Sequence, residues 1–124
     1  MSIQRLSILQ WFGALAAAGV AGATFLAGVG VTQAECNPGL KRFGIPHTAA
    51  QIAMTAVGVG VTLLAEWAAF VVYRATSDAE EQDPPPEGRQ HFFATAALAA
   101  NVIFLMIILL TGIAALSVHL CRQA

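Results

Sequence analysis

Three long apolar segments, separated by two short polar ones, set the pattern of the chain. The last is the clearest, because it holds no ionisable residue between His91 and His119. The first, residues 6–34, carries no charge, and the second, residues 43–73, is interrupted only by His47 and Glu66. Each exceeds the roughly 20 apolar residues that an α-helix needs to cross a bilayer. We therefore predict an all-α, single-domain membrane protein over residues 1–124, with three transmembrane helices at 6–33, 45–73 and 91–119 and an acidic, proline-containing loop at 74–90.

Composition supports this assignment and narrows the function. Hydrophobic residues make up 57% of the chain and charged residues only 10%, whereas soluble domains are about 25% charged. The two connections leave no room for a separate catalytic domain, and no nucleophile elbow, phosphate loop or zinc-protease helix occurs. A net charge of −1 without a Lys/Arg cluster does not favour nucleic acid. We expect no enzyme activity and no cofactor in this chain alone, and as partners other membrane subunits and the lipid bilayer.

Small residues in the first segment are spaced like a helix-packing motif. They recur at every fourth position in two series, Ala14, Ala18 and Gly22, and Gly19, Ala23 and Ala27. Because small side chains let helix backbones approach closely in lipid, we expect these series to pack against other helices.

A polar stripe follows one face of the second segment. Its members recur at intervals of four or seven residues: Gln51, Thr55, Thr62, Glu66 and Tyr73. A charged Glu66 facing lipid would cost a few kcal/mol, so the stripe should face protein or water. A single carboxyl makes no proton relay, which favours a partner contact or a protonated, hydrogen-bonded Glu66 inside the bundle over proton transport.

The third segment combines small residues with one amide on a single face. The face consists of Ala94, Ala97, Asn101, Ile108, Gly112, Ala115 and His119. Asn101 near mid-membrane, with small neighbours, predicts a hydrogen bond to another helix.

Two cysteines give an orientation that the charges do not. Arginine and lysine are balanced between the two sides, with Arg5, Arg74 and Arg89 against Lys41, Arg42 and Arg122. Three spans place Cys36 and Cys121 on the same side, where a disulfide would require an oxidising compartment. We therefore predict a Cys36–Cys121 disulfide, a cytoplasmic N-terminus and acidic loop, and a periplasmic or extracellular C-terminus.

The residues at this membrane boundary could instead form a metal or haem site. Thiolate and imidazole groups of Cys36, His47, His119 and Cys121 suit Cu(I) or Zn, and His47 with His119 is a conceivable haem ligand pair. The spacing is far from a paired CxxC signature, so the disulfide and interfacial histidines are favoured.

The order of several features resembles a known group of proteins. Cys36 follows the first span, His47 begins the second, Gly88-Arg89-x-x-Phe92 leads into the third with Phe104 inside it, and Cys121 follows. This order resembles small, uncharacterised three-span bacterial membrane proteins that are commonly encoded beside haem-copper cytochrome oxidase genes. The resemblance covers mainly the second half of the chain. It implies the bacterial inner membrane and a respiratory partner carrying the haem and copper, and it implies no activity for this chain.

Three functions follow from these features. The favoured one is a non-catalytic accessory or structural subunit of a larger membrane complex, of the respiratory, haem-copper oxidase type. The second is a copper- or haem-binding assembly factor that uses the outer Cys/His cluster. The third is a small transporter or proton-conducting oligomer centred on Glu66, which ranks last.

Overall fold

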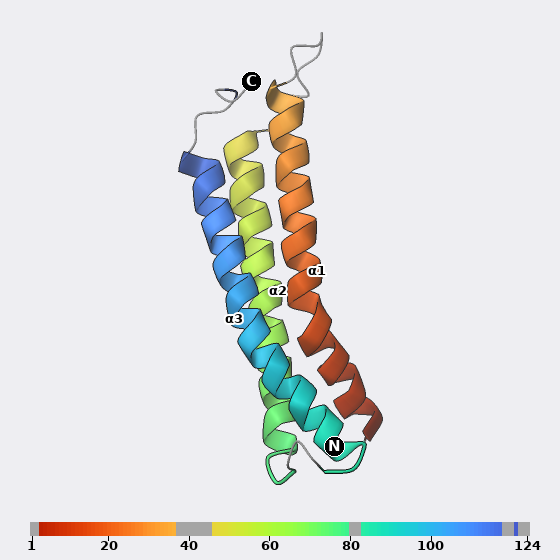
Figure 1. Ribbon diagram of the computed structural model, residues 1–124. Coiled ribbons are helices and arrows are strands. Elements are labelled where there is room, and N and C mark those ends of the chain that lie inside the picture. The colour runs from red at the N-terminus through yellow and green to blue at the C-terminus, as the bar shows by residue number, and fades with distance from the viewer. Residues whose placement is uncertain (1–2, 37–45, 80–82, 118–120, 122–124) are drawn as a thin grey trace.

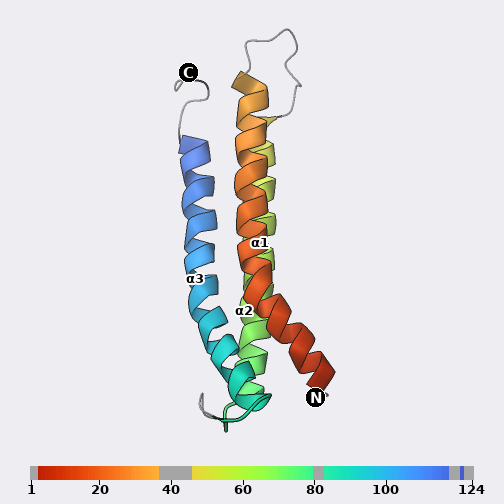
Figure 2. The same ribbon diagram turned by 45° about the vertical axis from the view of Figure 1, so that its right-hand side comes forward.

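Three helices account for nearly all of the described chain in the computed structural model, which describes residues 3–36, 46–79, 83–117 and 121. They are α1 (Ile3–Cys36), α2 (His47–Ala75) and α3 (Glu87–Ser117). Figures 1 and 2 show them side by side as a bundle, with α2 antiparallel to α1 and α3. All three are long and apolar enough to cross a membrane. The prediction of an all-α chain with three membrane-spanning helices is confirmed at this level.

Helix boundaries differ from the predicted spans around the acidic loop. α2 continues to Ala75, where the Thr76 hydroxyl donates to the Val72 carbonyl oxygen at 2.9 Å. α3 begins at Glu87, and the Gln90 N–H donates to the Pro86 carbonyl oxygen at 3.1 Å. The connection is therefore shorter than the predicted 74–90, because hydropathy detects the apolar part of a helix and misses its polar end turns. The predicted end of the third span at 119 lies outside the described residues.

The interior of the bundle is made of small residues. The buried apolar residues are mostly alanines, and only Val72 and Ile108 are larger. Bulky side chains such as Leu26, Trp67 and Leu110 are instead more than half exposed. This distribution suits lipid surroundings, because in a bilayer close backbone packing, rather than the removal of bulky groups from solvent, drives helix association.

α1 approaches α2 closely at Gly13. A Cβ at this position would lie 2.9 Å from the backbone nitrogen of Ala69 and 3.2 Å from the carbonyl oxygen of Ala65. Only a glycine fits there without displacement of a helix backbone.

The face that α1 buries is not one of the two predicted small-residue series. Its buried positions are Gln10, Gly13, Ala17, Ala21 and Gly28. The predicted positions Ala14 and Ala18 are half-buried, and Gly22, Gly19, Ala23 and Ala27 are exposed. The two series are therefore not the face that α1 buries within this bundle, and their packing against other helices stays a prediction. Small residues lie on almost every side of α1, so their fourfold spacing did not single out the buried face.

Candidate functional site

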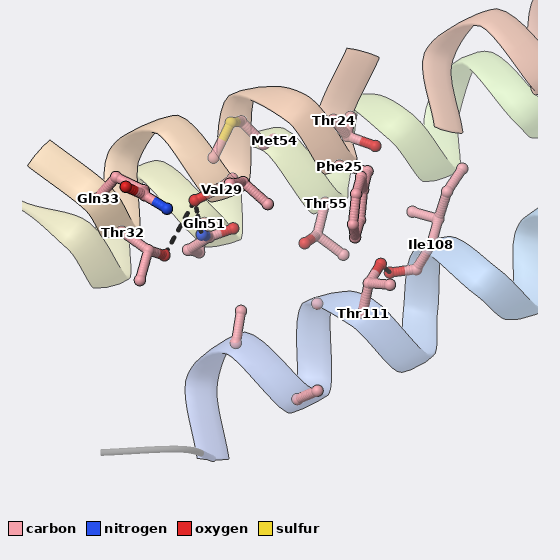
Figure 3. A pocket seen from close by; sticks show the side chains of 14 residues that line it. Thr24, Phe25, Val29, Thr32, Gln33, Gln51, Met54, Thr55, Ile108 and Thr111 are labelled. Carbon is pink, nitrogen blue, oxygen red and sulfur yellow. Dashed lines mark hydrogen bonds between the residues drawn. The ribbon is translucent and has the colours of Figure 1, made fainter. Parts of the chain in front are cut away.

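A cavity of about 320 Å³ lies between the three helices, in the half of the bundle that leads to the Cys36–Cys121 disulfide. Figure 3 shows its walls, to which α1 contributes Phe25 and Val29, α2 contributes Gln51 and Thr55, and α3 contributes Ile108. The volume falls at the lower end of the range typical of small-molecule sites. The cavity is thus large enough for a ligand or for part of one.

Small residues create this space. Gly28 on α1 and Gly112, Ala114 and Ala115 on α3 line the cavity with little or no side chain. The deep end is closed by Gly58 of α2, where an added Cβ would lie 3.1 Å from Ile108 and 3.4 Å from Thr24. Further toward the disulfide α2 stays close to both neighbours, because a Cβ at Gly28 would lie 3.2 Å from Gln51 and one at Gly112 would lie 2.6 Å from Thr55. The room is therefore left between α1 and α3.

Polar groups gather at the end of the cavity nearer the disulfide. The Gly28 carbonyl oxygen accepts two hydrogen bonds, from Thr32 Oγ1 at 2.9 Å and from Gln51 Nε2 at 3.3 Å (Figure 3). Thr32 Oγ1 also lies 3.2 Å from His47 Nε2. Because the Thr32 proton goes to Gly28, His47 Nε2–H is left to act as the donor in that contact. This contact joins the start of α2 to the end of α1. His47 is not among the residues that line the cavity.

The predicted polar stripe of α2 lies toward the interior. Gln51 and Thr62 are buried, whereas Thr55, Glu66 and Tyr73 are half-buried. Thr62 donates to the Gly58 carbonyl oxygen of its own helix at 2.8 Å, so its hydroxyl is satisfied locally. Thr55 instead faces α3, where a Cβ added to Gly112 would lie 2.6 Å from Thr55 Oγ1. Gln51 and Thr55 are the members of the stripe that line the cavity.

Asn101 connects α3 to α1 across the middle of the bundle. Its Nδ2 donates to the Gly13 carbonyl oxygen at 3.0 Å, and the residue is 1% exposed. This is an interhelical hydrogen bond of the kind that the sequence predicts. The bond requires the same close approach of α1 that Gly13 permits.

Two buried oxygens near this bond have no hydrogen-bond partner among the described residues, Asn101 Oδ1 and Glu66 Oε2. Contacts between α2 and α3 pair Gly58 with Ile108 and Tyr73 with His91. Glu66 is midway between Gly58 and Tyr73 and therefore lies at about the same height along the bundle as Asn101. No hydrogen bond to the Glu66 carboxyl is described, so the hydrogen-bonded form of Glu66 stays a prediction.

The predicted disulfide is present. Cys36 and Cys121 are bonded, with their Cα atoms 5.2 Å apart. His47 lies at the same end of the bundle, whereas His119 lies outside the described residues. No group of three or more His, Cys, Asp or Glu side chains placed to hold a metal occurs in the described part of the chain. Since a thiolate is the form of cysteine that binds metal, the disulfide form leaves neither sulfur available as a ligand.

The opposite end of the bundle contains a cluster that the sequence analysis missed. The His91 ring stacks on Tyr73 with centroids 5.0 Å apart, and His91 Nδ1 lies 3.1 Å from Thr76 Oγ1. These residues flank the acidic loop and join the end of α2 to the start of α3. An aromatic residue at the end of one span and a histidine at the start of the next is the signal that could have indicated it.

Comparison with protein-family models, with curated proteins and with solved structures found no match to this chain.

Proposed function

We propose that this protein is a non-catalytic accessory subunit of a larger membrane complex. A stripe of small residues on the outside of α1, here called the outer stripe, supports this proposal. Its members are Ala16, Gly19, Ala23, Ala27, Gly30 and Ala34, at intervals of three or four residues. All six are exposed or half-buried, and a Cβ at Gly19 or Gly30 would meet nothing within 4 Å. The intervals match those of a helix seam, so the outer stripe suits the close approach of another helix.

The outward-facing residues of α3 differ from the outer stripe of α1. α3 carries bulky apolar groups at these positions, as lipid-facing helices commonly do: Val102, Ile103, Met106, Leu110 and Ile113. The outer stripe of α1 instead offers backbone and methyl groups over about 27 Å of helix, from 18 residues at a rise of ~1.5 Å. The hydrocarbon core of a bilayer is about 30 Å thick. A partner helix that spans the membrane could therefore contact the outer stripe along nearly its whole length.

A respiratory complex of the haem-copper oxidase type is the partner we propose, on the strength of the resemblance alone. The test is purification of the tagged protein in mild detergent, followed by a reduced-minus-oxidised haem spectrum of the eluate. Haem bands with large co-eluting subunits are the expected result. A colourless product that contains this chain alone, with respiratory complexes intact after its deletion, would contradict the proposal.

Substitutions in the outer stripe sharpen the same experiment. Gly19→Leu together with Gly30→Leu should reduce co-purification of the partner at least tenfold, because each leucine occupies space that a neighbouring backbone would need. Gly60→Leu is the matched control, since a Cβ on exposed Gly60 of α2 also meets nothing within 4 Å but lies off the outer stripe. Equal loss of the partner in both variants would contradict a role for the outer stripe.

The disulfide supports the proposed orientation. Disulfides persist in oxidising compartments, so we infer that the Cys36–Cys121 end faces the periplasm of a bacterial inner membrane and that the N-terminus and acidic loop face the cytoplasm. A cysteine introduced at Asp78 of a Cys36→Ser/Cys121→Ser chain should react with a membrane-impermeant maleimide only after the cells are opened. Labelling in intact spheroplasts would mean that the acidic loop faces the periplasm and would contradict the proposed orientation.

An assembly factor that binds copper or haem is the less favoured function. Copper binding by the two cysteines needs them reduced, and the bonded sulfurs supply no thiolate. If the purified protein contained stoichiometric metal, and if Cys36→Ser and Cys121→Ser removed that metal, the assembly-factor function would be favoured instead.

A further inference from the structure

The cavity between the three helices has a gradient of polarity along the bundle axis. Phe25 and Ile108 lie at its end toward mid-membrane together with Thr24, Thr55 and Thr111, and the Thr24 and Thr111 hydroxyls donate to carbonyl oxygens of their own helices. Gln33 and Gln51, which carry side-chain amides, lie with Thr32 at the end nearer the disulfide. Figure 3 shows the two glutamines together at one end and Phe25 with Ile108 at the other. A ligand with a polar group at the disulfide end and an apolar portion toward mid-membrane matches this arrangement.

The walls also define the charge of the ligand. Among the described residues, none that lines the cavity is ionisable. The side-chain amide of Gln51 uses one N–H on Gly28, which leaves its second N–H, and Gln33 is exposed with its amide at the cavity rim. Donors without a counter-charge suit a neutral acceptor such as an ester carbonyl.

The position of the mouth defines how the ligand enters. The rim residues Val29 and Gln33 on α1 and Thr111 and Ala114 on α3 are exposed on the outside of the bundle. The cavity therefore opens sideways between α1 and α3, along helices that are long enough to span a membrane. A molecule that already resides in the bilayer reaches it without crossing water.

The volume limits how much of such a molecule fits. At about 30 Å³ for each water-sized atom, the cavity holds roughly ten heavy atoms. This is too small for a two-chain lipid but suits part of one hydrocarbon chain.

From these four observations we propose that the cavity is a lipid-binding site, which holds one acyl chain of a membrane phospholipid. The ester group lies beside Gln33 and Gln51, and the chain runs toward Ile108. The second acyl chain and the headgroup stay outside the mouth. A lipid in this position fills the space that Gly28, Ala114 and Ala115 border between α1 and α3.

The test is native mass spectrometry of the disulfide-bonded protein released from phosphatidylcholine nanodiscs. We expect one phosphatidylcholine to be retained per chain. Ala115→Phe, which fills the cavity, should lower the retained fraction at least tenfold. Ala100→Phe is the matched control, because Ala100 is also half-buried on α3 but does not line the cavity.

A second pair of variants tests the same site at exposed positions, where a substitution does not disturb the packing of the bundle interior. Ala114→Leu adds bulk at the exposed mouth and should lower lipid retention several-fold, whereas Ala99→Leu, on an exposed position away from the cavity, should not. Gln33→Leu should weaken retention through loss of the amide donor. Absence of retained lipid in the wild type, or equal retention in the Ala114→Leu and Ala99→Leu variants, would overturn the proposal.

Discussion

Replacement of both cysteines by serine is expected to lower the free energy of unfolding by about 2–4 kcal/mol. The disulfide joins residues 85 positions apart, so its loss releases the end of α1 from the segment that follows α3. A loop of this length gives an effect near the upper part of the usual range in water. We expect about 2–4 kcal/mol, less than the ~4–5 kcal/mol that chain entropy alone gives for such a loop in water, because helices that stay inserted after they separate have less freedom to gain. The measurement is unfolding by SDS titration in mixed micelles, followed by circular dichroism.

The control for this prediction is the wild-type protein after reduction. Both cysteines are replaced together so that no single thiol remains to form dimers. Reduced wild type and the Cys36→Ser/Cys121→Ser variant should unfold at the same SDS fraction, below that of the oxidised protein. If all three unfold together, the disulfide does not stabilise the bundle.

Gly13→Ala is expected to destabilise the bundle by about 1–3 kcal/mol, the usual cost of overpacking. The new Cβ would contact the backbone of Ala69 and Ala65, and a backbone cannot move aside as a flexible side chain can. α1 must therefore shift away from α2, and the hydrogen bond from Asn101 to the Gly13 carbonyl oxygen lengthens with it. The same SDS titration measures the loss.

Gly19→Ala is the matched control for Gly13→Ala. Gly19 lies on the same helix, and a Cβ there meets nothing within 4 Å. Its substitution should leave the free energy of unfolding unchanged or raise it slightly, since alanine is the better helix former. Equal effects of the two substitutions would mean that α1 and α2 do not approach as closely at Gly13 as described.

Hydropathy was enough to predict the helices. The apolar segments are so long that only a membrane-spanning helix accommodates them, and this holds whatever the neighbouring segments do. The disulfide was predictable for a similar reason. Two spans lie between Cys36 and Cys121, and an even number of spans returns the chain to the side of the membrane from which it started. Both predictions needed only the count and direction of the helices.

Side-chain packing was less accessible from the sequence. In α1, glycine and alanine lie on so many sides that several stripes satisfy the same spacing rule. The buried face is selected by shape, since Gly13 alone meets a backbone on α2 within 3 Å. In α2, polar groups are rare enough to mark one side, and the stripe from Gln51 to Tyr73 therefore lies toward the interior or at its edge.

The cavity could not be predicted from any one segment. It is bordered by Gly28 of α1 and by Gly112 and Ala115 of α3, while Gly58 of α2 lies against Ile108 toward mid-membrane. Sequence periodicity describes one helix at a time and carries no information on which small residues end up opposite each other.

The Cys36–Cys121 bond also determines whether the fragments separate after proteolytic cleavage. Residues 36–121 form a covalently closed ring that contains both connections between the helices. A single cut in the acidic loop opens the ring, yet both fragments stay joined through the sulfur bridge. The nicked molecule therefore keeps its full mass on a non-reducing gel and separates into two pieces only when a thiol reagent is added.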